Sequence, residues 1–443
     1  MSRDVTLAAT VVLAMFVIYN ANGREIASYD SQPTKFAARE LLLRGTLSLN
    51  YVVGFTPGLA KRSAFVETAG GRYRSAYSPV PAVMAAAITW PFWKTGLIDI
   101  RAPRGPGFMA ALSSSLLVSL AVALAFLTAR TRLSVGRSLA LAVGLGVGTG
   151  LWSTVSQTLW QHETAIFGLS LAVYALMTMD RGAGLRGVLV GLGLGLAAGS
   201  RLQLMPAVAI ALAGIAVSAG WRRAALATAC ACGVIVPVLF LNYQWFGTVL
   251  GAAPILEALH GTVHRTSGSF ALQLEGPVGL LVSPNRGLLV FSPIVAVAFL
   301  GIPRSLREGW TSPYRWLVLA AAAQFTLYAL YTVWWGGHTF GPRYMLDTLP
   351  LLVPAAAIGM ETLRTPSRRV LAFVALAWSV GVAALGAFNY PHERWNSDPV
   401  DVDIAHDRLW NVSDTQIRRA WLAGPSPQNF NLFTLEAVRV PQP

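Results

Sequence analysis

An aspartate stands in a long polar segment that directly follows the first apolar run of the chain. That residue, Asp30, lies just after the apolar residues 5–19. A carboxylate that stays ionised beside cations can accept a proton from a hydroxyl group, as a general base does. Lys35 and Arg39 follow in a stretch with helical spacing that stops at Gly45, so both are predicted to lie close to Asp30 as substrate-binding cations. The alternative is that Asp30 only caps this helix.

A dense polar run, residues 152–163, separates two later apolar segments and ends in His162 and Glu163. An imidazole there could donate to a phosphate, and the carboxylate could orient a hydroxyl group or hold a divalent cation. The competing interpretation is an interfacial belt of aromatic residues with a glutamate that caps the following helix.

Arg201 occupies a very short turn between two apolar segments. An arginine next to hydrocarbon is costly and usually has a partner, which makes it a candidate for a functional site. A lipid phosphate would satisfy the guanidinium group, and so would extension of the side chain to the lipid headgroups.

The segment 334–347 combines paired glycines with charged side chains. The glycines predict a tight turn, and Arg343 and Asp347 are four residues apart, so they are expected to form an ion pair on one helix face. Arg343 and His338 are then candidates to bind a phosphate or pyrophosphate oxygen. The alternative is a purely structural turn that contains an ion pair.

The composition places these groups on an all-α polytopic membrane protein. Hydrophobic residues make up 54% of the chain and charged residues only 12%, about half the charge of a soluble domain. Apolar segments long enough to cross a bilayer recur along the chain. The net charge of +14 lies in short basic clusters between these segments, which is typical of membrane orientation signals and excludes a nucleic-acid partner.

About eleven transmembrane helices are predicted. They cover approximately residues 5–21, 106–128, 135–152, 164–179, 185–200, 203–219, 224–243, 289–303, 315–335, 344–360 and 369–389. Residues 79–93 are short and rich in tryptophan, and they are expected to lie on the outer leaflet, because every basic cluster then falls on the cytoplasmic side. If they crossed the membrane, the clusters would face outward.

This topology predicts a transmembrane domain, residues 1–389, and a polar outer tail, residues 390–443. The N-terminus is then cytoplasmic, and the long outer loops are residues 22–105, with interfacial helices, and residues 247–288. All the candidate groups named above gather on the outer face. Nucleotide-binding motifs are absent from the sequence, and an outward-facing enzyme has no nucleotide sugar available, so an activated donor would be lipid-linked.

The pattern resembles the GT-C superfamily of integral-membrane glycosyltransferases, which includes protein O-mannosyltransferases and lipid A aminoarabinose transferases. The resemblance covers roughly residues 1–220: the first span, the loop with Asp30 and the helix after it, the segment beginning at Tyr77, and the polar turn ending Gln161-His162-Glu163. It implies a polyprenyl-phosphate-sugar donor and a catalytic aspartate that maps onto Asp30. Many members have paired acids in the first loop, whereas Asp30 is followed here by Ser31.

The sequence therefore predicts an inverting glycosyltransferase whose active site lies on the outer face of the membrane, with Asp30 as general base. Lys35, Arg39, His162, Glu163, Arg201, His338 and Arg343 are the candidate substrate-binding residues. A glycan, a lipid or a protein could be the acceptor, and membrane lipid surrounds the chain. The sequence establishes no cofactor, and a divalent cation is the one candidate. A transporter or flippase of a lipid-linked sugar and a non-catalytic subunit of an envelope-assembly complex are the alternatives.

Overall fold

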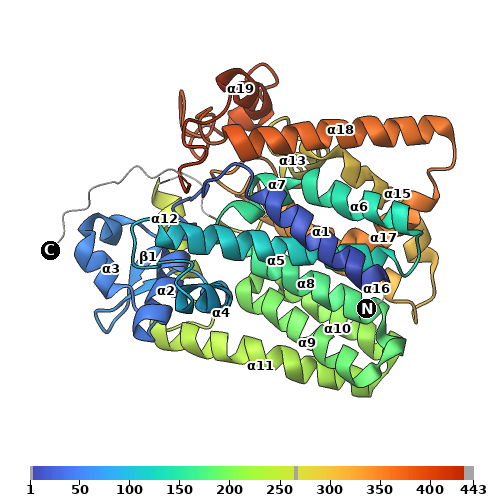
Figure 1. Ribbon diagram of the computed structural model, residues 1–443, viewed down its shortest axis with the longest axis horizontal. Coiled ribbons are helices and arrows are strands. Elements are labelled where there is room, and N and C mark those ends of the chain that lie inside the picture. The colour runs from blue at the N-terminus through green and yellow to red at the C-terminus, as the bar shows by residue number, and fades with distance from the viewer. Residues whose placement is uncertain (1–2, 264–267, 434–443) are drawn as a thin grey trace.

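The computed structural model describes residues 3–263 and 268–433, and this part of the chain is a bundle of helices with one small hairpin (Figure 1). The first half contains α1 (Arg3–Tyr19), α2 (Ser31–Arg44), α3 (Asn50–Phe55), η1 (Pro57–Lys61), β1 (Phe65–Glu67), β2 (Tyr73–Ser75), α4 (Val80–Lys94), α5 (Gly105–Ala129), α6 (Val135–Val147), α7 (Gly150–Ser153), η2 (Val155–Gln157), α8 (His162–Met177), η3 (Met179–Arg181) and α9 (Ala183–Ser200). The second half contains η4 (Leu202–Leu204), α10 (Met205–Ala219), α11 (Trp221–Phe246), α12 (Ala253–Val263), α13 (Glu275–Val282), α14 (Leu288–Phe291), η5 (Pro293–Val295), α15 (Ala296–Arg307), α16 (Pro313–Leu330), η6 (Tyr344–Thr348), α17 (Leu349–Glu361), α18 (Pro366–Asn389), η7 (His406–Trp410) and α19 (Gln416–Ala423).

Small residues allow the central helices to pack closely. The helix α5 lies against α1, α4, α6 and α8, and α8 packs along α9. A Cβ atom added at Gly168 of α8 would lie 2.5 Å from the carbonyl oxygen of Gly193 on α9, and one at Gly193 would lie 2.4 Å from the oxygen of Gly168. Each helix therefore needs glycine where its backbone meets the other, as is common between membrane helices.

Four helices of the described chain are long and apolar enough to cross a membrane by themselves. They are α5, the continuous segment Leu202–Ala219, α11 and α18, and the bent pair formed by α6 and the segment Gly150–Gln157 makes a fifth. Other apolar segments form shorter helices, such as α8, so length and composition do not establish all eleven predicted spans. The count of eleven stays a prediction.

The first polar loop folds into a layer at one end of the bundle. Its helices α2 and α4 pack together and against α5, and the hairpin pairs Phe65 with Ser75. The helix α4 has 15 residues and is therefore about 22 Å long, shorter than the ~30 Å hydrocarbon core. Predicted spans such as α8, with 16 residues, are nearly as short, so the placement of residues 79–93 on the outer leaflet stays a prediction.

The glycine-rich segment forms the tight turn that the sequence predicts. Gly336, Gly337 and Gly341 all have positive φ angles, 76°, 71° and 75°, a backbone region that glycine enters without steric cost. Arg286, which lies between α13 and α14 and is 1% exposed, joins this turn to the tail. It donates to the carbonyl oxygens of Trp335 and Gly337 and to the side-chain oxygens of Asn396 and Gln416. Residues 434–443 of the predicted tail lie outside the described residues.

Candidate active site

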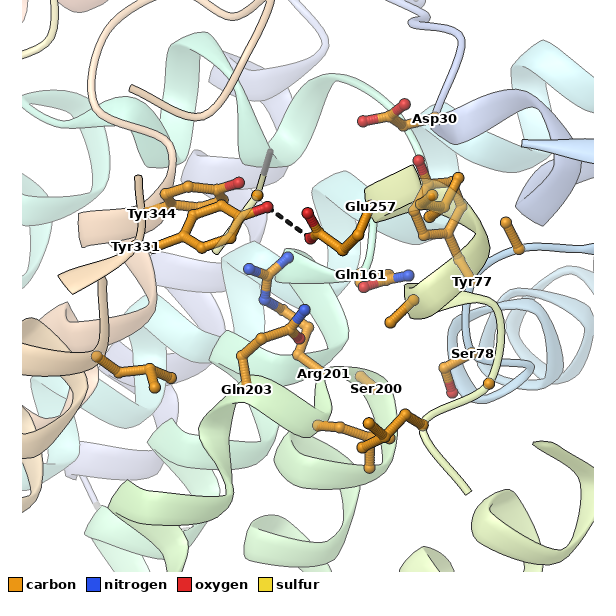
Figure 2. Close-up of a pocket in the computed structure, with 18 of the residues that line it drawn as sticks. Asp30, Tyr77, Ser78, Gln161, Ser200, Arg201, Gln203, Glu257, Tyr331 and Tyr344 are labelled. Carbon is orange, nitrogen blue, oxygen red and sulfur yellow. Dashed lines mark hydrogen bonds between the residues drawn. The ribbon is translucent and has the colours of Figure 1, made fainter. Parts of the chain in front are cut away.

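A cavity of about 570 Å³ opens at the end of the bundle where α2, α4 and α12 lie (Figure 1). Its wall combines residues 76–78, 160–162 and 200–203 with parts of α12, the end of α16 and the start of η6. Two carboxylates, two guanidinium groups and one imidazole line it within the described chain: Asp30, Glu257, Arg201, Arg343 and His162. Figure 2 shows several of these side chains converging from different elements.

Asp30 and Arg343 meet at the wall of this cavity. Nη1 of Arg343 donates to Oδ2 of Asp30 over 3.2 Å. Asp30 precedes α2, but its side chain makes no capping hydrogen bond to that helix. The capping role is therefore absent in this structure, and the carboxylate turns toward the cavity instead (Figure 2).

Tyr77 supports the Asp30 carboxylate from the other side. Burial, followed by the charge of Asp30, raises the pKa of the Tyr77 phenol well above its ordinary value. The phenol therefore stays protonated and can donate to the carboxylate (Figure 2). Arg343 and Tyr77 thus contact the Asp30 carboxylate from two sides.

Arg343 retains hydrogen-bonding capacity after its contact with Asp30. Its guanidinium carbon lies 5.0 Å from the ring centroid of Trp160 and 5.5 Å from that of Tyr344. Its Nε atom is buried and has no hydrogen-bond partner among the described residues. A planar cation fixed between rings with donors unused is well suited to a phosphate oxygen.

Asp347 is the centre of a buried polar network beneath the cavity. Its Oδ1 lies 2.8 Å from Nδ1 of His162, and its Oδ2 accepts from the Tyr328 hydroxyl at 2.8 Å and lies 3.0 Å from Nε of Arg201. The predicted pair of Arg343 and Asp347 is therefore wrong. Residues Tyr344–Thr348 form a 3₁₀ helix, with three residues per turn, so side chains four apart do not share a face.

The same network fixes the roles of His162 and Arg201. Nη1 of Arg201 lies 3.1 Å from Nε2 of His162, and arginine has no acceptor atom, so Nε2 must accept and Nδ1 must carry the proton given to Asp347. Both ring nitrogens of His162 are then occupied, which leaves none to donate to a phosphate. Arg201 is buried and paired with Asp347, so its side chain does not extend to the headgroups.

Tyrosines form the opposite wall of the cavity. Tyr328 and Tyr344 stack with ring centroids 4.9 Å apart, and the Tyr331 hydroxyl donates to Oε1 of Glu257 over 2.7 Å (Figure 2). The other carboxylate oxygen of Glu257 is buried and has no hydrogen-bond partner among the described residues. An aromatic wall with such a carboxylate offers a stacking surface and an acceptor for a hydroxyl or amino group.

Lys35 and Arg39 do not accompany Asp30 as predicted. Nζ of Lys35 contacts Glu25 at 2.6 Å, and Nη1 of Arg39 contacts Glu40 at 2.9 Å. These local acids neutralise the cations, and neither cation lines the cavity. The cation beside Asp30 is instead Arg343, from the glycine-rich segment 334–347.

Glu163 and His338 also lie outside the cavity wall. Glu163 is fully buried at the start of α8. His338 is on the surface, where its Nε2 lies 2.9 Å from Asp401 and 3.5 Å from Asp403. These three side chains have the donor types that a divalent cation takes, and their ligand atoms lie within 4.8 Å of one another. A cation there would join the tail to the turn and would not reach the cavity.

The residues that sequence reasoning missed are mainly Tyr77, Trp160, Glu257 and the tyrosines of the far wall. Glu257 had a usable signal, because it is the only acid in the otherwise apolar segment 247–263. Aromatic residues gave no such signal, since tryptophan and tyrosine are common at membrane interfaces for other reasons.

Part of the cavity wall is apolar. Val238 of α11, Leu250, Leu256 of α12 and Leu327 of α16 contribute to its wall. The cavity thus joins a charged region around Asp30 and Arg343 to a hydrocarbon-like surface, a combination that suits a ligand with a polar head and an apolar tail.

Comparison with known structures identifies the fold. The chain is similar to ArnT from Cupriavidus metallidurans bound to undecaprenyl phosphate, with a TM-score of 0.53 and 13% identity over 95% of this chain and 75% of that one. It is also similar to the Archaeoglobus fulgidus oligosaccharyltransferase tethered with an acceptor peptide, with a TM-score of 0.54 and 12% identity over 91% of this chain and 59% of that one. No family profile and no curated protein sequence matches the chain.

These likenesses show the fold of the chain. The chain has the fold of the GT-C membrane glycosyltransferases, as the sequence pattern predicts, and it is an integral membrane protein.

Proposed function

We propose that this protein is a membrane glycosyltransferase that moves a sugar from a polyprenyl-phosphate donor to an acceptor hydroxyl group on the outer face of the membrane. The GT-C fold supports the reaction class. The similar structures contain undecaprenyl phosphate and, in the archaeal AglB complex with an inhibitory peptide, dolichol phosphate. Both are polyprenyl-type phosphates, and they set the donor class proposed for this chain.

The observation that carries the proposal is the pairing of Asp30 with Arg343 at one cavity. A general base and a phosphate-binding cation must lie within the span of one sugar ring and its phosphate. The two groups are 3.2 Å apart, and both line the cavity. Entry of a donor phosphate would draw Arg343 toward the phosphate and release the Asp30 carboxylate to the acceptor.

The reaction then follows as a single displacement. Asp30 takes the proton from the acceptor hydroxyl group, and the resulting oxygen forms a bond to the anomeric carbon from the face opposite the phosphate. The bond between that carbon and the phosphate oxygen breaks, and the phosphate leaves with the electron pair. Arg343 stabilises the negative charge that develops on it, the kind of preorganised electrostatic contact that contributes most to many enzymes. The configuration of the sugar is inverted.

The buried network around Asp347 supports the side chains next to Arg343. His162 and Asp347 hold Arg201 in place, and Arg201 lies with its guanidinium carbon 6.0 Å from the ring centroid of Tyr344. Tyr344 in turn lies under Arg343. Arg201 is thus fixed at the cavity wall with its charge paired to Asp347, and His162 helps to hold it there.

The apolar wall offers a place for the donor's isoprenoid chain, and the acceptor can be a glycan, a lipid or a protein. No step of the proposed reaction passes through a metal ion. A divalent cation at His338, Asp401 and Asp403 would stabilise the fold of the tail.

A turnover assay tests the proposal. The purified protein, reconstituted in liposomes, is given a panel of polyprenyl-phosphate sugars with glycan, lipid and peptide acceptors. We expect release of polyprenyl phosphate together with a new glycosidic bond of inverted configuration, read by mass spectrometry and NMR. Movement of the intact donor across the bilayer without bond cleavage would instead identify a flippase. Absence of both would leave a non-catalytic role.

A further inference from the structure

A second cavity lies away from the candidate active site, between α6, α15, α17 and α18. It has a volume of about 390 Å³, and its wall is apolar, with Leu141, Val297, Met360 and Leu376 among the residues that form it. In Figure 1 the starts of α6 and α18 lie toward the end of the bundle that carries the N-terminus, opposite the layer formed by α2 and α4.

Two arginines stand at the edge of this apolar cavity. Arg137 near the start of α6 and Arg369 near the start of α18 both line it and are exposed. Arg137 makes no hydrogen bond or ion pair with any residue of the described chain. Nε of Arg369 donates to the carbonyl oxygen of Leu363 at 3.1 Å, and its other side-chain nitrogens have no protein partner within that part of the chain.

No acid of the described chain forms an ion pair with either arginine. The carboxylate at the end of α17, Glu361, accepts from Arg132 at 2.8 Å and from Arg304 at 3.1 Å. Glu361 is thus already shared by two other arginines. The edge of the cavity carries uncompensated positive charge directly above an apolar pocket.

We propose that this cavity binds an anionic phospholipid, with the phosphate between Arg137 and Arg369 and part of an acyl chain in the pocket. Basic pockets between membrane helices are recognised sites for anionic lipid headgroups. The charge of the site favours an anionic lipid over a zwitterionic one. A zwitterionic headgroup would place its own cation beside two guanidinium groups that have no acidic partner. The lipid would fill the gap beside α18, much of whose surface is exposed: Val370, Leu371, Phe373 and Trp378 are each more than half exposed.

Binding of lipid to the delipidated protein tests the proposal. The full chain in detergent is titrated with phosphatidylglycerol and with phosphatidylcholine, and bound lipid is counted by native mass spectrometry. We expect tighter binding of phosphatidylglycerol. The double variant Arg137→Gln/Arg369→Gln should weaken it roughly 20–30-fold, since each arginine beside a lipid phosphate contributes about a factor of five.

Three further variants sharpen the result. Arg222→Gln/Arg223→Gln removes the same charge at the start of α11, away from the pocket, and should leave the affinity for phosphatidylglycerol unchanged. Arg137→Lys/Arg369→Lys should retain most of the binding, and its unfolding temperature without lipid reports on folding. Ala140→Trp fills the pocket and should weaken binding while both arginines remain. Equal loss in the α11 variant, or equal affinity for both lipids, would overturn the proposal.

Discussion

The guanidinium group of Arg343 donates to the carboxylate of Asp30 over 3.2 Å, although 313 positions separate the two residues in the chain. This contact joins the first polar loop to the glycine-rich turn and places both groups at one cavity. A base and a phosphate-binding cation are thereby held within reach of one donor.

Arg343 should be needed for the chemical step. Arg343→Lys retains a charge but loses the planar set of donors, and we expect kcat to fall by about 10²–10³, the usual cost of removing one preorganised donor from a developing anion. The steady-state release of polyprenyl phosphate measures this. Arg72→Lys, at an exposed arginine between β1 and β2, is the matched control and should leave kcat unchanged. Normal kcat in Arg343→Lys would remove Arg343 from the mechanism.

Asp347 should be needed for the stability of the folded protein. Asp347→Asn removes the charge that faces Arg201 and leaves that cation buried, which typically costs about 3–5 kcal/mol of unfolding free energy. Denaturant or thermal unfolding in detergent measures the loss. Asp180→Asn, an exposed aspartate in η3, should cost almost nothing. Unchanged stability in Asp347→Asn would show that the pairing of Asp347 with Arg201 does not stabilise the fold.

The sequence predicted the fold class and the residues that face the cavity better than it predicted their partners. Asp30, Arg201, His162 and Arg343 all follow from polar residues placed between apolar runs, and all line one cavity. The partners of these residues depend on the local backbone conformation, which the sequence analysis assumed to be α-helical. The 3₁₀ conformation of residues Tyr344–Thr348 separates Arg343 from Asp347.

Local charges explain the other differences. Lys35 and Arg39 have acids within easy reach, Glu25 and Glu40, and local pairing leaves them no role beside Asp30. Contacts such as that between Asp30 and Arg343 join distant segments, and only the packing of the bundle brings them together.

Stability should fall as pH rises through the weakly acidic range, because of Glu393 in the tail. Burial raises the pKa of this carboxyl group from 4.5 to about 7. Between these values the folded state holds a proton that the unfolded state has lost, so the unfolding free energy decreases with rising pH and levels off above about pH 7. The full effect is roughly 3 kcal/mol as an upper figure.

Unfolding followed from pH 4.5 to 8 checks this prediction. Glu393→Gln keeps the acceptor for Gln416 and removes the titrating proton, so its stability should change less over the range. If the wild-type protein and Glu393→Gln follow parallel curves, another group controls the dependence.

Glu257 should recognise the sugar and take no part in proton transfer. Glu257 lines the cavity beside Tyr331, and its second carboxylate oxygen has no hydrogen-bond partner among the described residues (Figure 2). Glu257→Gln should therefore raise KM about tenfold, the scale of one lost charge-assisted hydrogen bond, while kcat changes little. Substrate titration of the purified variant separates the two constants. A large fall in kcat at unchanged KM would make Glu257, and not Asp30, the better candidate for the base.

The most direct test of the account is the single-turnover rate of Asp30→Asn with a saturating polyprenyl-phosphate sugar. The amide keeps the shape of the side chain and an oxygen that accepts a hydrogen bond from Arg343, but it cannot take the proton of the substrate hydroxyl group. We therefore predict that the single-turnover rate falls by about 10²–10⁴-fold while donor binding is preserved. Glu67→Gln, an exposed acid of the same loop, serves as control. A near-normal rate in Asp30→Asn would contradict the assignment of Asp30 as general base.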